Sequence, residues 1–175
     1  MRPLIGTNLK RFLRDYRRAN KPDGTYAALL QSVEYPANVG SIFRIADGAG
    51  LAELVLTGIT PTPPNPAIDK VARYKSLRIP WRYEQDALTA AQEMKAKGYS
   101  LVAIELAEDA VPYHTFSYPQ QSCFIVGHED HGVTKAVLAE CDAAVFVPMY
   151  GKGLSLNVHV ALAVVVYHAL HANRG

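Results

Sequence analysis

Three short segments place polar side chains beside glycine, each where one apolar run gives way to another. They are Asn38-Val39-Gly40-Ser41-Ile42-Phe43-Arg44, Gly127-His128-Glu129-Asp130-His131-Gly132 and Gly151-Lys152-Gly153-Leu154-Ser155-Leu156-Asn157. A carboxylate in such a loop can accept a hydrogen bond from a ligand hydroxyl or amine, and an arginine can donate two hydrogen bonds to a phosphate. Open α/β folds bind ligands where strands run into helices at the carboxyl edge of the sheet. We therefore expect the three segments to form one site.

Several of these residues also have a purely structural interpretation. Asn38 could cap the helix that follows it, and Ser155 stands where the last helix should have its N-cap. Arg44 lies between two apolar residues, where an arginine can also lay its stem along the surface and keep its charge in water. Gly151 and Gly153 would let the backbone approach a ligand closely.

Common cofactor fingerprints do not fit the sequence. His128 and His131 lack the H-E-x-x-H spacing of a zinc site and have no cysteine nearby, so no metal is expected. The segment Gly151-Lys152-Gly153 does not match a P-loop, and Gly48-Ala49-Gly50 follows a predicted helix, which argues against a dinucleotide fingerprint. The G-x-S-x-G elbow of many hydrolases is missing as well.

Size and composition indicate a globular protein. The 175 residues, of which 49% are hydrophobic and 19% charged, suit one domain with a sizeable core. No apolar run reaches the length that crosses a bilayer, and the first residues lack the apolar core of a signal peptide. Cys123 and Cys141 have no CxxC spacing, so both are expected to be free thiols in a reducing cytoplasm.

The net charge of +2 conceals an uneven distribution. The first 21 residues carry seven basic groups against Asp15 alone, which leaves eleven of the 18 basic and fifteen of the 16 acidic residues for the rest. A second basic cluster lies between residues 70 and 82, interleaved with Tyr74, Trp81 and Tyr83. Positive charge beside aromatic faces favours phosphates and unstacked bases. Either cluster alone could equally be a solvated surface, but the two together favour a nucleic acid as the partner. The residues expected to bind it are Lys10, Arg11, Arg14, Arg17, Arg18, Lys70, Arg73 and Lys75, and the second cluster also includes Arg78 and Arg82.

The hydrophobic periodicity alternates between strand and helix, which predicts a mostly parallel sheet flanked by helices. We predict that residues 1–24 form a basic N-terminal arm with a short helix, and that residues 25–175 form one α/β domain.

Residues 60–66 (Thr-Pro-Thr-Pro-Pro-Asn-Pro) should be an extended surface loop. Asn38 and Gly48 should begin and end the first helix of the domain, and Thr134 should begin another. The predicted strands are Ala27–Val33, Glu53–Ile59, Ser100–Leu106, Ser122–Val126 and Ala143–Val147, and the predicted helices are Leu9–Arg18, Val39–Asp47, Asp86–Lys97, Thr134–Glu140 and Leu156–His171.

The three segments, taken in order and with Val147-Pro148-Met149 leading into the last, resemble the motifs of the SpoU, or TrmH-like, RNA 2′-O-ribose methyltransferases of the SPOUT superfamily. The resemblance runs from about Leu29 to Tyr167. It implies a parallel α/β domain with a C-terminal trefoil knot, S-adenosylmethionine held bent by the knotted loops, and a homodimer that completes each active site.

By motif position, the resemblance assigns cofactor contacts to Gly127, Val147, Met149 and Leu156, largely through their backbone. It assigns catalytic roles to Arg44, Asn38, Glu129, Ser155 and Asn157. The chain departs from the pattern where Asp130-His131 replaces a small or polar pair. It departs again where His159 replaces serine and His168 an acidic residue. The first departure is expected to alter RNA contacts, and neither His159 nor His168 falls on a position to which we assign chemistry.

The resemblance implies in-line attack of a ribose 2′-oxygen on a sulfonium methyl, with tRNA favoured over rRNA as the substrate. Arginine has a pKa of about 12 or higher and is a poor base, so we favour Arg44 as an organiser that binds the target phosphate. The alternative that Arg44 itself acts as the base that deprotonates the 2′-hydroxyl stays open. Asn38 would hold Arg44, Glu129 would orient the ribose or the arginine, and Ser155 and Asn157 would line the pocket. The alternatives are a knotted RNA-binding protein without catalysis and a small-molecule binder or hydrolase.

Overall fold

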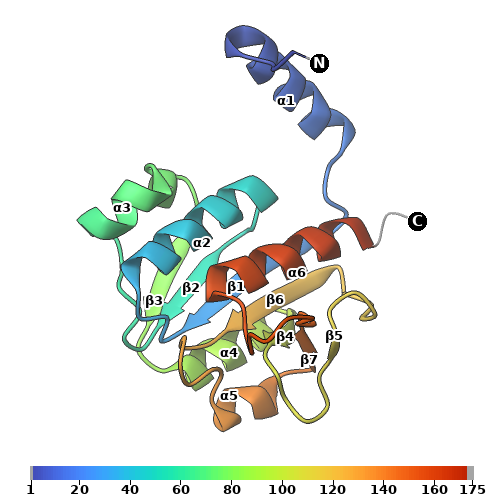
Figure 1. Ribbon diagram of the computed structural model, residues 1–175. Coiled ribbons are helices and arrows are strands. Elements are labelled where there is room, and N and C mark those ends of the chain that lie inside the picture. The colour runs from blue at the N-terminus through green and yellow to red at the C-terminus, as the bar shows by residue number, and fades with distance from the viewer. Residues whose placement is uncertain (1, 173–175) are drawn as a thin grey trace.

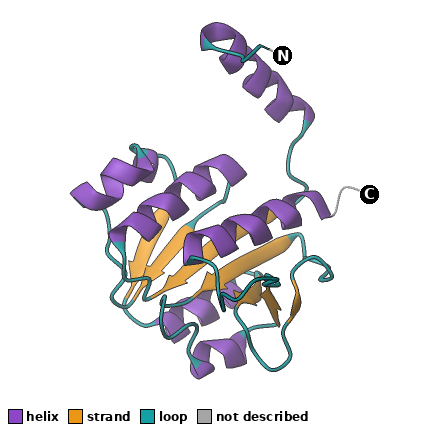
Figure 2. Cartoon of the chain, in the orientation of Figure 1, coloured by secondary structure: helices purple, strands orange, loops and turns teal. Residues whose placement is uncertain are grey.

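The computed structural model describes residues 2–172 and contains one seven-stranded sheet in which every strand pair is parallel. The strand order is β3-β2-β1-β6-β4-β7-β5. Helices cover both faces (Figures 1 and 2), so the central strands are buried on both sides and are almost wholly apolar. The strands are β1 (Thr25–Gln31), β2 (Leu54–Thr57), β3 (Trp81–Glu84), β4 (Ser100–Ile104), β5 (Val111–Pro112), β6 (Gln121–Val126) and β7 (Ala143–Phe146).

Two cores lie on the two faces of the sheet. On one face α2, α3 and α6 pack around Phe43, Leu30 and Leu162, while on the other α4 and α5 pack around Leu29 and Met94. Alternate residues of β1 thus enter different cores, as the pleat of a strand requires. The helices are α1 (Gly6–Ala19), α2 (Pro36–Ala49), α3 (Pro66–Ala72), the 3-10 turn η1 (Lys75–Leu77), α4 (Ala87–Ala96), α5 (Lys135–Glu140) and α6 (Val158–Ala172).

The first helix differs from the others because none of its residues is buried. Figure 1 shows α1 standing away from the sheet, joined to β1 by a short connection. One side of α1 is apolar, with Leu9, Phe12 and Tyr16 all exposed, and the basic residues occupy the rest of its surface. Among residues 2–172, no helix is long and apolar enough to span a bilayer.

The predicted strands and helices are all present, but several predicted ends are wrong. Asn38 does not cap α2: the helix begins two residues earlier at Pro36, because proline is well suited to the first turn. The same helix runs past Gly48 and ends at Gly50, whose left-handed φ of 72° closes it. Thr134 does occupy the N-cap position of α5.

Four elements were not predicted: α3, η1, β3 and β5. The proline-rich segment is a loop as far as Asn65, whose side chain then caps α3 by accepting from the backbone of Ala67 at 2.9 Å. Pro66, predicted as loop, is the first residue of that helix. The strand β3 is only four residues long and sits at one edge of the sheet, so its alternation of aromatic and charged residues is too short to indicate a strand.

Candidate active site

A cavity of about 580 Å³ opens at the carboxyl ends of β1, β4, β6 and β7. Its walls come from the turn after β4, the loop after β6, the segment before α6 and the first turn of α2. These segments lie far apart in the sequence and meet because the carboxyl ends of parallel strands share one edge. The volume is in the range of small-molecule and cofactor sites.

Seven of the nine predicted catalytic and cofactor residues line this cavity. They are Asn38, Gly127, Glu129, Val147, Ser155, Leu156 and Asn157. Met149 is half-buried in the same segment but is not part of the wall. The three sequence segments therefore converge, apart from Arg44.

Arg44 lies outside the cavity wall. It is exposed on α2, and its side chain forms no hydrogen bond or ion pair with any residue between positions 2 and 172. Asn38 is buried and faces the cavity, whereas Arg44 lies six positions further along the helix and shares the outer face with Ala37 and Ser41. The prediction that Asn38 holds Arg44 within one chain is therefore wrong.

Asn38 instead contacts Glu129. Its Nδ2 donates to Glu129 Oε1 at 2.6 Å, and the same carboxylate accepts from the backbone N–H groups of Glu34 at 2.9 Å and Tyr35 at 3.4 Å. The Glu129 carboxylate thus satisfies backbone N–H groups just before α2, where the helix dipole also favours negative charge. Glu129 has a structural function in addition to any chemical one.

These contacts set the ionisation of Glu129. Burial raises the pKa of this carboxyl, but the hydrogen bonds from Glu34, Asn38 and Tyr35 lower it by more, and the net pKa lies below its ordinary value. The side chain is therefore a carboxylate at neutral pH and can only accept hydrogen bonds.

The loop after β6 is a tight turn closed by two backbone bonds between His128 and Gly132, of 3.2 and 2.8 Å. Gly127 enters this turn so closely that a Cβ there would collide with the backbone of Gly132 and Val133. Glycine at 127 is thus required by the close approach of two backbone segments.

The two histidine rings of this turn lie against each other, tilted by 32°. The rings of His128 and His131 are 4.6 Å apart, and Nε2 of His128 lies 3.4 Å from a carboxylate oxygen of Glu34. Within residues 2–172, no group of three or more histidine, cysteine, aspartate or glutamate side chains is placed to hold a metal ion.

The start of the last helix also differs from its prediction. Ser155 does not cap α6, which begins at Val158; the Asn157 Oδ1 atom accepts from the backbone N–H of His159 at 3.3 Å instead. Ser155 is left on the cavity wall, exposed and outside the helix. On the outer face of this helix, Val160 and Tyr167 are exposed.

Glu105 also lines the cavity, although no sequence motif singled it out. It accepts from the backbone of Val133 at 2.9 Å through one oxygen and from that of Leu106 at 2.9 Å through the other. Glu105 follows β4 directly, so the rule that ligands bind beyond the carboxyl ends of strands would have found it.

The two predicted basic surfaces differ in how many of their charged groups are exposed and free of ion pairs. The five basic residues of α1 are all exposed, as are Lys70 and Arg73. Lys75 forms an ion pair of 2.6 Å with Asp47 and is half-buried, so less of it is free for RNA.

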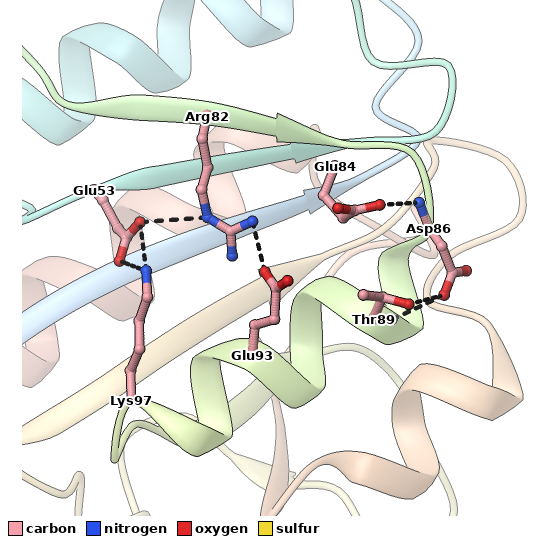
Figure 3. A network of polar contacts seen from close by, with 7 residues as sticks. All are labelled: Glu53, Arg82, Glu84, Asp86, Thr89, Glu93 and Lys97. Carbon is pink, nitrogen blue, oxygen red and sulfur yellow. Dashed lines mark hydrogen bonds and ion pairs between the residues drawn. The ribbon is translucent and has the colours of Figure 1, made fainter.

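Arg82 does not belong to the second basic cluster. It points to the α4 side of the sheet, where Nη1 lies 2.8 Å from Glu93 and Nε lies 3.7 Å from Glu53. Figure 3 shows Glu53 held between Arg82 and Lys97 in this network. Strand alternation decides this, since neighbouring residues of β3 point to opposite faces.

Comparison with known proteins agrees with this geometry. The model of the SpoU rRNA Methylase family matches residues 26–167. The chain is 34% identical over 140 residues to the 23S rRNA (guanosine(2553)-2′-O)-methyltransferase RlmP of Bacillus subtilis, covering 80% of this chain and 56% of that protein. It is 31% identical to the tRNA (guanosine(18)-2′-O)-methyltransferase of Thermus thermophilus, covering 91% of this chain and 80% of that protein.

A solved structure has the same fold. An AdoMet-bound rRNA methyltransferase from Sinorhizobium meliloti superposes with a TM-score of 0.78 at 26% identity, covering 88% of this chain and 58% of that one. The chain thus spans little more than half the length of two of these three proteins.

Proposed function

Because the chain belongs to the SpoU methylase family, we propose that it transfers a methyl group from S-adenosylmethionine to a ribose 2′-hydroxyl of structured RNA, tRNA ahead of rRNA. The observation that carries the proposal is the cavity in which the three family motifs meet, with Asn38 bonded to Glu129 on its wall. The relatives named above act on tRNA and on rRNA.

The cavity suits this cofactor in its volume and in the groups on its wall. Gly127, Val147 and Leu156 would contact it mainly through their backbone, and Ile104 and Val126 supply apolar wall. Glu105 has acceptor capacity beside its two backbone bonds, so it can receive a ligand hydroxyl. Once bound, the cofactor supplies an electrophilic sulfonium methyl.

The protein is proposed to act as a homodimer. The outer face of α6 exposes Val160 and Tyr167, and α2 lies beside α6 with Arg44 exposed on the same side. Apolar residues on an exposed helix face mark interaction surfaces, and a second copy seated there would bring Arg44 towards the partner's cavity. This arrangement accounts for an arginine that lies outside the cavity of its own chain.

In this dimer Arg44 would bind the target phosphate and stabilise the negative charge that develops on the attacking 2′-oxygen. Asn157 and Ser155 would line the path of the ribose, and Glu129 would keep the start of α2 in place. Arg44 acting as the base itself would need its pKa to fall sharply on RNA binding.

RNA capture is assigned to residues 1–24 and to the exposed Lys70 and Arg73. The five basic residues of α1 are exposed, and the one ion pair that they form within residues 2–172, between Arg14 and Asp15 at 2.9 Å, is exposed and weak. A cytoplasmic location and a C-terminal trefoil knot are part of the proposal. The unpaired thiols of Cys123 and Cys141 support the former, and family membership supports the latter.

Incubation with labelled S-adenosylmethionine and total RNA, followed by mapping of the 2′-O-methylated nucleotide, tests the proposal. We expect label in one RNA class at one position. Calorimetry with the cofactor separates the main alternative, because a knotted RNA binder without catalysis would not bind millimolar S-adenosylmethionine. Cofactor binding without transfer to any RNA would overturn the assigned activity.

A further inference from the structure

His159 contacts the Asn38–Glu129 pair, although it stands where the family usually has serine. Its Nδ1 lies 3.1 Å from Asn38 Oδ1 across 121 positions of sequence. His159 is half-buried in the first turn of α6, and Asn38 is almost fully buried in the first turn of α2. The three side chains therefore form one row from the loop after β6 to the last helix.

The chemistry of this row fixes the orientation of each member. Glu129 is a carboxylate and can only accept, so the group of Asn38 that faces it at 2.6 Å must be the NH₂. The Asn38 carbonyl oxygen then faces His159 and needs a donor. Because an imidazole nitrogen donates only when it carries a proton, Nδ1 of His159 must be protonated.

The charge state of His159 follows from its surroundings. Burial lowers the pKa of this imidazole below its ordinary value, so the ring is neutral at neutral pH. A neutral imidazole with its proton on Nδ1 leaves Nε2 as an acceptor, and free histidine in water favours the opposite tautomer. The fold thus selects the less common form.

We propose that His159 is a positioning residue for the methyl-transfer site, holding the Asn38 carboxamide through its Nδ1–H so that Asn38 and Glu129 keep one orientation at the cavity wall. The proposal rests on the methyltransferase function proposed above. Without this bond the buried carbonyl of Asn38 would lack its donor, and the carboxamide could turn away from Glu129.

Two substitutions test which nitrogen matters. In His159→Asn the side-chain NH₂ lies close to the position of Nδ1, whereas in His159→Gln it lies close to that of Nε2. We expect His159→Asn to keep kcat within about threefold, and His159→Gln and His159→Ala to lose about tenfold, the effect of one hydrogen bond. The Kd for S-adenosylmethionine should change less than twofold, because His159 is not on the cavity wall. The reverse order, with His159→Gln active and His159→Asn impaired, would overturn the proposal.

A measurement on the free protein needs neither cofactor nor RNA. The ¹⁵N chemical shifts of the His159 ring should show the Nδ1–H tautomer in the wild-type chain and a shift towards Nε2–H in Asn38→Ala. An Nε2–H tautomer in the wild-type chain, or one that Asn38→Ala leaves unchanged, would refute the contact. A wild-type protein that binds no cofactor and methylates no RNA would instead refute the proposed function, while the tautomer would still report on the contact.

Discussion

Asn38 Nδ2 donates to Glu129 Oε1 at 2.6 Å, and this bond joins two motifs that are 91 positions apart. The same carboxylate accepts from the backbone of Glu34 at 2.9 Å. A single side chain in the loop after β6 therefore fixes both the start of α2 and the carboxamide that faces the cavity. The stability of the fold and the geometry of the site depend on the same bonds.

Replacement of Glu129 by glutamine should make stability less dependent on pH. The pKa of Glu129 is lowered in the folded protein, so its contribution is present above the unfolded pKa of about 4.3 and is lost as pH falls through the folded pKa. We expect wild type to exceed Glu129→Gln in free energy of unfolding by about 1 kcal/mol at pH 7, with the gap closing towards pH 3. Urea denaturation at several pH values measures this. Glu108→Gln, at an exposed carboxylate after β4, is the control, and a gap independent of pH would contradict the prediction.

Addition of one methyl group at Gly127 should disrupt the loop after β6. The new Cβ would collide with the backbone of Gly132 and Val133, and backbone cannot give way as a flexible side chain can. We expect Gly127→Ala to lower the free energy of unfolding by about 1–3 kcal/mol and to weaken cofactor binding. Gly151→Ala is the matched control, because a Cβ there meets nothing within 4 Å. Equal stability of the two variants would disprove this account.

A charge on the outer face of α6 should prevent dimer formation. Val160 is 38% exposed there, and a glutamate in the proposed interface would bury an unpaired charge. Light scattering should show a dimer for wild type and a monomer for Val160→Glu. Leu77→Glu is the control, since Leu77 is an 82% exposed apolar residue on η1. A dimer that survives Val160→Glu would place the interface elsewhere.

Loss of Arg44 should abolish methyl transfer and leave cofactor affinity within a few-fold, because Arg44 is not on the cavity wall of its own chain. Single-turnover assays and calorimetry measure the two quantities, with Lys97→Ala as the control, because this exposed cation pairs with Glu53 and belongs to neither basic surface. If Arg44 acts in the partner's cavity, mixing Arg44→Ala with Asn157→Ala should restore part of the activity. Full activity of Arg44→Ala alone would remove its assigned role.

Removal of charge from the N-terminal arm should weaken RNA binding and flatten its salt dependence. Each lost phosphate contact lowers the slope of log K against log salt by about 0.7 to 0.9. Changing the five basic residues of α1 to glutamine should therefore reduce the slope by several units. Lys95→Gln with Lys97→Gln is the control, because these lysines form ion pairs with Asp142 and Glu53. An unchanged slope for the α1 variant would mean that the arm does not bind RNA.

The strands and helices with strong periodicity were predictable to within a few residues. The prediction Ser122–Val126 differs from β6 by one residue, because a short run of buried apolar residues between turns has few other solutions. Helix ends were less predictable: Asn38 and Ser155 are both good capping residues, yet Tyr35 precedes α2 and Asn157 caps α6. Local propensity cannot decide between two nearby caps when tertiary contacts hold one of them.

The alternation of strand and helix, the three polar segments at their junctions and the basic arm can all be predicted from the order of residues along the chain. The three-dimensional fold sets which side chains meet. It brought Glu129 and His159 to Asn38, turned Arg82 towards Glu93 and left Arg44 outside the cavity. Such contacts join residues far apart in sequence and depend on strand order and on the face each residue occupies, which local patterns do not specify.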